Sequence, residues 1–385
     1  MASQDQNKAN TDLSLFAIAT PGLESFTAQE LERLGVAETK AIFGGVSFRG
    51  PRSTLYRTNL HLRTASRVLV RFGTFRATKF PELRRKASHL SWETFLRPGQ
   101  AVTLRTTSHR SRLIHQRAVT ERVLGAIQDR LGQAVRPVKA SSPESTTAQL
   151  ILVRLMHDEC MISIDSSGPL LHQRGYRLAT AKAPLRETVA AGMILASGWD
   201  RHSPFLDPFC GSGTIAIEAA LMAKNLLPGS KRRFAFMEWP DFDQALWQSL
   251  LAEIRPASDM PLPPILASDR DRGAVEAARE NAGRAGVMDS IGFSCRSISA
   301  IEPPSDPGWV VTNPPYGVRV SRTKDLRDLY AAFGGVLREK CPGWNVTIFS
   351  PNASLERATG LGLGPATTVI TGGLKLRLVT GQVPA

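Results

Sequence analysis

The stretch Asp207-Pro208-Phe209-Cys210-Gly211-Ser212-Gly213-Thr214 predicts more about the fold of this chain than any other. It follows the apolar residues Phe205 and Leu206 and leads into an apolar run, which indicates a strand, a glycine-rich turn and a helix. The glycines let the backbone approach a ligand, and the helix N-terminus offers unpaired N–H groups. Proteins that bind NAD, FAD or S-adenosylmethionine share this fingerprint, and a glycine turn without any ligand is the alternative.

Two acidic residues favour S-adenosylmethionine among these ligands. Asp207 closes the strand before the turn, where a carboxylate suits the ammonium of an amino acid and not a pyrophosphate. Asp269 closes the next apolar stretch, Ile265–Asp269, and can accept hydrogen bonds from both hydroxyls of a ribose. We therefore predict a cofactor site at the turn and the two strand ends, formed by Asp207, Pro208, Gly211, Ser212, Gly213, Thr214 and Asp269.

A second motif, Asn313-Pro314-Pro315-Tyr316, follows the apolar stretch Trp309–Thr312. Two prolines stiffen the backbone, so that the Pro314 carbonyl and the Asn313 side-chain oxygen can accept the two protons of an exocyclic amine. Such an amine is a poor nucleophile because its lone pair is delocalised into the ring, and these acceptors would localise it. Tyr316 can stack on the base. Asn313 would also adjoin the cofactor, and the alternative is a rigid loop with Tyr316 as a packing aromatic.

The rest of the chain supports an α/β protein with small α+β modules in front. From Leu185 onward, helical patterns alternate with short apolar stretches, which is typical of a doubly wound parallel sheet. We expect strands over Phe205–Asp207, Ile265–Asp269, Ile291–Ser294, Trp309–Asn313 and Asn345–Ser350, and an edge strand over Leu374–Val379.

The net charge of +14 is concentrated in the front half of the 385 residues. Residues 1–180 hold 26 Lys and Arg against 14 Asp and Glu, whereas residues 181–385 hold 22 against 20. This asymmetry predicts one part that binds a polyanion and another that performs chemistry. The four cysteines have no metal-type spacing, and no signal peptide or membrane span is evident. These features favour a cytoplasmic protein without a structural metal.

Two arginine clusters are candidates for phosphate contacts. The first, Ser108–Arg117, interleaves basic and apolar residues before a predicted helix, and the second, His172–Arg177, lies where the two halves of the chain meet. A solvated helix face and a plain linker are the respective alternatives. The residues predicted to contact RNA are Arg110, Arg112, Arg117, Arg174 and Arg177.

The chain resembles the bacterial large-subunit ribosomal RNA guanine-N2-methyltransferases that carry a THUMP domain. The strings that carry the resemblance occur in the family's order: Ala19–Glu24, Gly44–Phe48, Arg174–Arg177, Ala183–Thr188, Asp207–Thr214 and Asn313–Gly317.

This resemblance implies a ferredoxin-like module over residues 1–65, a THUMP domain over residues 66–168, and a class I methyltransferase domain over residues 169–385. The last is expected to have a Rossmann-like, seven-stranded, mostly parallel sheet. Ser297 stands where the family usually places an acidic residue that binds the cofactor's adenine, so we retain it as a cofactor contact.

The sequence thus predicts an S-adenosylmethionine-dependent methyltransferase that acts on the N2 amine of a guanine in 23S ribosomal RNA, naked or within an assembly intermediate. A tRNA guanine-N2-methyltransferase of the same architecture, a DNA adenine-N6-methyltransferase and a catalytically silent RNA-binding assembly factor are the rivals. A basic domain that precedes the catalytic domain argues against DNA. Neither the target guanine nor the oligomeric state follows from the sequence.

Overall fold

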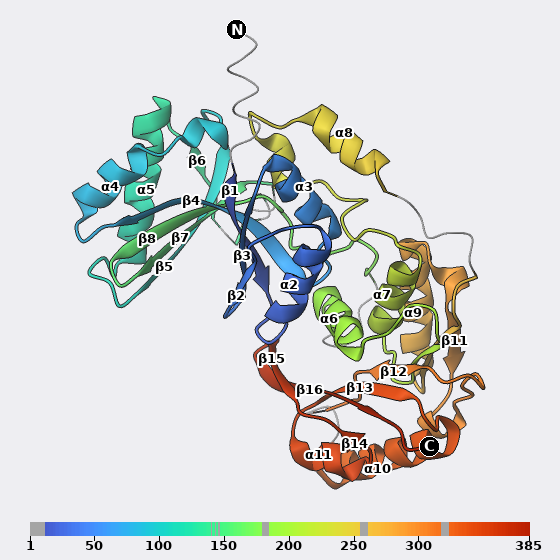
Figure 1. Cartoon of the computed structure of the whole chain (residues 1–385). Helices are drawn as coiled ribbons and strands as arrows, with labels where there is room; N and C mark the ends of the chain where they lie inside the picture. Colours follow the sequence, from blue (N-terminus) through green and yellow to red (C-terminus); the bar gives the residue numbers. More distant parts are fainter. Residues whose placement is uncertain are drawn as a thin grey trace.

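The computed structural model describes residues 12–139, 141–142, 144, 147–178, 185–254, 261–316 and 323–385. Two eight-stranded sheets organise these residues, one in each half of the chain. Figure 1 shows the first sheet with its helices at one end of the molecule and the second sheet at the other. Among the described residues, no helix combines the length and the apolar character needed to cross a bilayer.

The first sheet is continuous across both predicted front modules. Its strand order is β2-β3-β1-β4-β8-β7-β5-β6. The long strand β4 joins the modules, because it pairs with β1 on one side and with β8 on the other. The strands are β1 (Leu13–Ala19), β2 (Lys40–Ile42), β3 (Gly45–Gly50), β4 (Ala65–Arg76), β5 (Ala101–His109), β6 (Arg136–Pro137), β7 (Gln149–Met156) and β8 (Glu159–Asp165).

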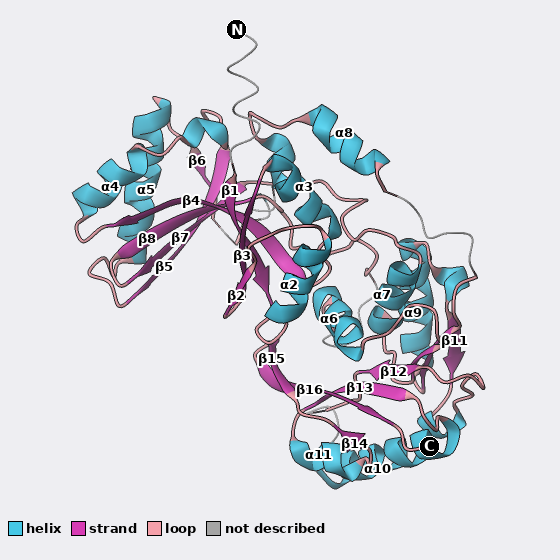
Figure 2. Ribbon diagram, viewed as in Figure 1, coloured by secondary structure: helices cyan, strands magenta, loops and turns pink. Residues whose placement is uncertain are grey.

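Helices cover one face of this sheet, as the ribbon in Figure 2 shows. Alternate strand residues such as Leu15, Val68, Ile151 and Ile164 are buried in one core with the apolar stripes of the helices. The other face of the sheet carries the remaining residues of each strand. The helical layer consists of α2 (Glu24–Arg33), α3 (Arg52–His61), α4 (Phe80–Ser88) and α5 (Gln116–Leu131), with a short 3-10 turn η1 (Trp92–Thr94).

The second sheet has the doubly wound pattern that the sequence predicts, with order β11-β10-β9-β12-β13-β16-β14 and β15 paired to β16. The first five strands are parallel, and β16 is antiparallel to β13. The predicted edge strand Leu374–Val379 is instead internal, because β13, β14 and β15 all pair with it. The strands are β9 (Phe205–Asp207), β10 (Ile265–Asp269), β11 (Gly292–Cys295), β12 (Trp309–Thr312), β13 (Asn345–Ser350), β14 (Gly362–Leu363), β15 (Thr367–Thr371) and β16 (Leu374–Gln382).

Helices pack on both faces of the second sheet. One core joins α6, α7 and α9 to residues such as Phe205 and Val311, and a separate core joins α10 and α11 to Leu206 and Val310. Successive strand residues thus enter opposite cores, as in other sheets covered on both sides. The helical elements are α6 (Glu187–Ser197), α7 (Thr214–Ala223), α8 (Gln244–Ala252), α9 (Arg272–Ala285), α10 (Thr323–Lys340) and α11 (Ala353–Ala358), with 3-10 turns η3 (Ala235–Glu238), η4 (Met288–Ser290) and η5 (Ile298–Ala300).

The connection from α7 to β10 reaches back into the first half of the molecule. Phe236 and Trp247, from this connection, are buried in the core of the first sheet, and the Phe236 ring stacks on Tyr56 of α3 at 4.4 Å between centroids. These contacts fix the front modules against the second half of the chain.

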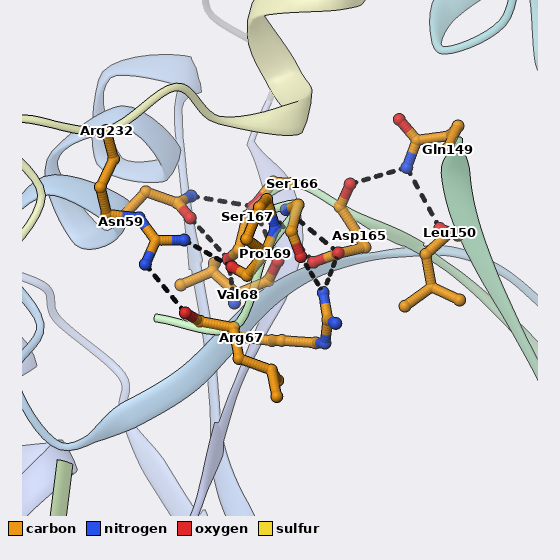
Figure 3. Close-up of polar contacts among 12 residues, drawn as sticks. Asn59, Arg67, Val68, Gln149, Leu150, Asp165, Ser166, Ser167, Pro169 and Arg232 are labelled. Atoms are coloured by element: carbon orange, nitrogen blue, oxygen red, sulfur yellow. Dashed lines mark hydrogen bonds and ion pairs between the residues drawn. The ribbon is translucent and has the colours of Figure 1, made fainter. Parts of the chain in front are cut away.

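A polar network beside this connection adds to the junction (Figure 3). The buried carboxylate of Asp165 pairs with Arg67 and accepts from the backbone N–H of Ser167 at 3.0 Å. Asn59 accepts from the hydroxyl of Ser167 at 2.7 Å, and Arg232 donates to the carbonyls of residues 169, 170 and 173. Buried charges are stable when they are paired and hydrogen-bonded in this way.

Candidate active site

The predicted cofactor and amine motifs meet at one edge of the second sheet. β9 lies between β10 and β12, and all three are parallel, so Asp207, Asp269 and Thr312 end their strands on the same side. The chain moves outward to β10 and β11 and then returns to the other side of β9 at β12. Ligands of open α/β sheets bind at such a switch point, beyond the carboxyl ends of the strands.

The glycine turn after β9 has the conformation that its sequence requires. Gly211 and Gly213 have φ of +51° and +83°, a region that side chains disfavour. A Cβ on Gly213 would lie 2.9 Å from the Cβ of Ala278 in α9, whereas a Cβ on Gly211 would meet open space. The turn is thus packed against α9 at one glycine and open at the other. The open side is where a ligand can approach the backbone.

Asp207 is buried and only partly satisfied. Its Oδ1 accepts a hydrogen bond from the Thr312 hydroxyl at 2.6 Å, which ties β9 to β12. Its Oδ2 is buried without a partner among the described residues. Burial raises the pKa of this carboxyl from 3.8 to about 7. A buried carboxylate with an unused oxygen fits a cationic group such as an ammonium.

Asp269 has a structural role that the sequence does not indicate. Its Oδ2 accepts from the Gly211 N–H, and its Oδ1 accepts from the Asp271 N–H, both at 3.0 Å. The carboxylate therefore holds the glycine turn and the start of α9. Each oxygen keeps a second lone pair, so the predicted contact with ribose hydroxyls remains compatible with these bonds.

Asn313 follows β12 directly, and its Oδ1 is buried without a hydrogen-bond partner among the described residues. Pro314 is buried, and Tyr316 is half-buried against the core that contains α6, α7 and α9. Residues Gly317 and Arg319 lie outside the described residues. An unsatisfied buried amide oxygen costs free energy, which a donor from a bound ligand would recover. This oxygen and Asp207 Oδ2 stand at the ends of adjacent strands.

Pro208, Ser212 and Thr214 complete the turn around these groups. Ser212 and Thr214 are buried, and Thr214 is the first residue of α7. The Ser212 carbonyl accepts from the side chain of Asn281 in α9 at 3.1 Å. Of the predicted cofactor residues in this turn, Gly211 is thus the one whose position faces open space.

Ser297, the predicted adenine contact, is exposed at the start of η5, and its hydroxyl shares a 2.9 Å hydrogen bond with Ser299. A cavity of about 260 Å³ lies nearby, between β9, β10, β11 and η5. Its lining includes neither the glycine turn nor Asn313, so it is separate from the strand-end groups described above. The residues that line it include Ser268, Phe293, Arg296, Ile301 and Glu302.

The placement of Arg174 and Arg177 corrects the prediction that they contact RNA phosphates. The Arg174 side chain is 3% exposed, and it donates to the Leu171 and Arg63 carbonyls at 2.7 Å. Arg177 donates to the Leu185 carbonyl and pairs with the buried carboxylate of α6's first residue at 2.5 Å. Both guanidinium groups are taken up by protein acceptors, so they fix the junction between the two halves of the chain.

The other cluster of predicted RNA contacts lies on the surface. Arg110, Arg112 and Arg117 are exposed in the loop after β5 and at the start of α5. Arg112 lies 3.8 Å from Asp158, and Arg117 pairs with Glu121 at 3.1 Å. Their contact with RNA stays a prediction. Among the described residues, no cluster of His, Cys, Asp and Glu could hold a metal ion.

Sequence reasoning missed Thr312 and Glu187. Thr312 connects the two motifs through Asp207, and nothing in its local sequence sets it apart from an ordinary strand residue. Glu187 is 2% exposed at the start of α6, and burial raises its pKa to about 7 despite the pairing with Arg177. Its position near the helix start was visible in the sequence, but its burial was not.

Comparisons with protein families match the whole length of the described fold. Residues 174–375 match the RMKL-like methyltransferase domain family, residues 14–69 the RlmL ferredoxin-like domain, and residues 77–165 the THUMP domain. The candidate RNA methyltransferase slr0064 of Synechocystis sp. is 36% identical, over 94% of this chain and 95% of that protein. The ribosomal RNA large subunit methyltransferase K/L of Methylococcus capsulatus is also 36% identical, over 94% of this chain. The chain spans about half the length of that relative, 50%.

Two solved structures resemble the whole chain. The candidate methyltransferase SMU.472, complexed with S-adenosylhomocysteine, is 31% identical with a TM-score of 0.86, over 96% of this chain and 98% of that one. A Listeria monocytogenes protein, described as a predicted N6-adenine-specific DNA methylase, is 33% identical with a TM-score of 0.86, over 97% of each chain. The names of these similar proteins therefore point to different nucleic acids.

Proposed function

This chain belongs to the family of RMKL-like methyltransferases with ferredoxin-like and THUMP domains, and on that premise we propose that it methylates the N2 amine of a guanine in 23S ribosomal RNA. The methyl donor is S-adenosylmethionine, whose sulfonium supplies an electrophilic methyl group when it is bound. The observation that carries the proposal is the buried Asn313 Oδ1, which has no partner among the described residues and ends the strand next to β9.

The residues at the strand ends fit this cofactor. Asp207 Oδ2 is a buried acceptor suited to the ammonium of the methionine part, and Thr312 holds the other oxygen in place. Gly211 leaves open space beside the backbone, and Asp269 retains lone pairs for ribose hydroxyls. Ser297 remains the proposed adenine contact. Together these groups bind and orient the donor at the edge of the sheet.

The amine-binding role falls to the motif after β12. The Asn313 Oδ1 accepts one proton of the exocyclic amine, and the Pro314 carbonyl accepts the other. These two acceptors localise the nitrogen lone pair, which otherwise spreads into the ring, and positioning then provides most of the acceleration. Tyr316 stacks on the target base, a contact worth about 1–3 kcal/mol. The base must leave its helix to reach this motif.

Three observations favour ribosomal RNA as the substrate. The front half carries a charge surplus of 12, the match to a THUMP domain lies within it, and the K/L relatives are named for the large ribosomal subunit. The name of the Listeria protein favours DNA adenine as the second candidate, because the same Asn-Pro-Pro-Tyr device suits either amine. A tRNA guanine and a silent assembly factor are the remaining alternatives.

Methyl transfer from labelled S-adenosylmethionine to ribosomal RNA, tRNA and DNA separates these candidates. We expect label in ribosomal RNA made from cells that lack the protein, and N2-methylguanosine after digestion to nucleosides. Label in DNA alone, or N6-methyladenine among the products, would overturn the proposal. RNA binding without any transfer would favour the assembly factor.

A further inference from the structure

The face of the first sheet that the helices leave open is strongly basic. Strand pairing places every second residue on this open sheet face, for example Phe16 opposite Ser47 and Leu69. Lys40 of β2 and Arg49 of β3 lie on the same face, and so do Arg71, Arg105 and Arg154 by their register. The exposed acid on this face is Glu159, because Asp165 is buried and paired with Arg67.

The arginines of this face lack the carboxylate partners that arginines have elsewhere in the same modules. On the helical layer, Arg84 pairs with Asp129 at 2.7 Å and Arg130 with Glu93 at 2.6 Å. Within the described residues, by contrast, no ion pair involves Arg49, Arg71, Arg105 or Arg154.

Arg71 is the centre of this arrangement. Its guanidinium lies 4.4 Å from the centroid of the Phe16 ring and donates to the Ser47 hydroxyl at 2.8 Å, so it is held in place on the sheet. Burial and the positive charge of Arg154 lower the pKa of Arg71. Two arginines that repel each other across neighbouring strands are stabilised by a polyanion that contacts both.

The spacing and position of these residues suit a nucleic-acid backbone. Adjacent strands lie about 4.8 Å apart, so cations on neighbouring or next-neighbouring strands are spaced at about 5–10 Å, a range that includes successive phosphates. The face also adjoins the catalytic half of the chain. At the end of β1, the Pro21 carbonyl accepts from the Ile370 N–H of β15 at 2.9 Å.

We propose that the open sheet face is a binding surface for the backbone of the substrate RNA, with Arg49, Arg71, Arg105 and Arg154 as its phosphate contacts. This inference rests on the proposed function for the identity of the polyanion. It places the RNA across both front modules rather than only on the loop with Arg110 and Arg112, which begins where β5 leaves this face. The continuous sheet, joined by β4, makes the two modules one surface.

The test replaces the two fully exposed arginines Arg105 and Arg154 by Gln in one variant. Its matched control replaces Arg85 and Arg122, which are exposed on α4 and α5 of the helical layer. Binding of a labelled RNA stem-loop is measured without cofactor over a series of salt concentrations. Each phosphate contact contributes about 5-fold at 0.1 M salt, so the first variant should bind about 25-fold more weakly, with a salt slope smaller by about 1.4.

The control pair should keep both the affinity and the slope of the unmodified chain. Equal weakening in both variants would mean that net charge alone acts, and it would overturn the surface, as would wild-type binding by the Arg105/Arg154 variant. Arg71→Gln, checked for an unchanged thermal unfolding midpoint, should weaken binding as well. Failure of the proposed function is seen separately, because it appears as absent methyl transfer to RNA whether or not the stem-loop is bound.

Discussion

Two buried oxygens at adjacent strand ends define the chemistry at the scale of single residues. Asp207 Oδ2 and Asn313 Oδ1 both lack a partner among the described residues, and Thr312 links their strands. Proteins rarely bury such atoms unsatisfied without a functional reason. In the proposed function, one oxygen serves the methyl donor and the other serves the acceptor amine, so substitutions at the two sites should have different effects.

Replacement of Asn313 by Ala should remove turnover and spare cofactor binding. The side chain is proposed to contact the amine and not the donor, and loss of one positioned polar group typically slows a reaction by about 100-fold or more. Single-turnover methyl transfer and calorimetric titration with S-adenosylhomocysteine measure the two effects. Equal loss of both would show that Asn313 serves the cofactor instead.

Asp207→Asn should separate stability from cofactor binding. The pKa of the Asp207 carboxyl is raised from 3.8 to about 7, so the folded chain keeps a proton that the unfolded chain has already released. The folded state therefore loses stability as the pH rises from about 4 to about 7. The Asn variant has no such proton, so its stability should depend less on pH in this window and should match or exceed that of the unmodified chain at pH 8.

The same variant should bind S-adenosylhomocysteine much more weakly, because an amide cannot neutralise the ligand's ammonium. In the unmodified chain, affinity should fall as the pH drops below about 7, where the carboxyl becomes protonated. Denaturant titrations and calorimetry across this range provide both measurements. A variant that keeps wild-type affinity would remove Asp207 from the cofactor site.

At the scale of elements, the two glycines of the turn before α7 have different duties. Gly213 packs against α9, and Gly211 faces open space, although both have positive φ. The turn thus combines a packing requirement with a ligand-facing position within three residues. Asp269, from the neighbouring strand, holds the Gly211 N–H and so fixes the turn before any ligand binds.

Gly213→Ala should destabilise the chain more than Gly211→Ala. The first adds a contact at 2.9 Å to backbone strain, whereas the second adds strain of about 1–2 kcal/mol alone. Chemical denaturation measures the difference. In the Gly211 variant, affinity for S-adenosylhomocysteine should fall although the fold persists, and unchanged affinity would place the ligand elsewhere.

At the scale of the whole molecule, the two halves of the chain share one core. Phe234, Phe236, Trp239 and Trp247 belong to the connection after α7 but are buried in the core of the first sheet. The network around Asp165 in Figure 3 adds buried polar contacts at the same junction. An RNA bound on the front modules would therefore be held at a fixed position relative to the strand ends of the catalytic half.

Trp247→Ala should loosen this junction. Removal of a buried tryptophan costs about 3–5 kcal/mol, and the loss falls on contacts between the halves. The unmodified chain should unfold in one calorimetric transition, and the variant should show a lower midpoint or two separated transitions. Phe43→Ala, at a side chain that is 83% exposed, is the control and should leave the midpoint unchanged. Two transitions in the unmodified chain would contradict the shared core.

The sequence by itself determined the features that depend on a few neighbouring residues. The glycine turn, the Asn-Pro-Pro-Tyr motif and the alternating strands of the second half follow from backbone geometry, and the structure has the strands β9, β10, β12 and β13 where we expected them. The order of the two motifs along the chain was sufficient to place them at one sheet edge, because parallel strands share their direction.

Tertiary structure alone decided which charged groups are buried and which surfaces are continuous. Arg174 reads like Arg112 in the sequence, but Glu218, 44 residues away, and two backbone carbonyls enclose it. The pairing of β4 with both β1 and β8 likewise joins two modules into one sheet and creates the basic open face. Burial and strand pairing depend on partners distant in sequence, so no local pattern of residues can specify them.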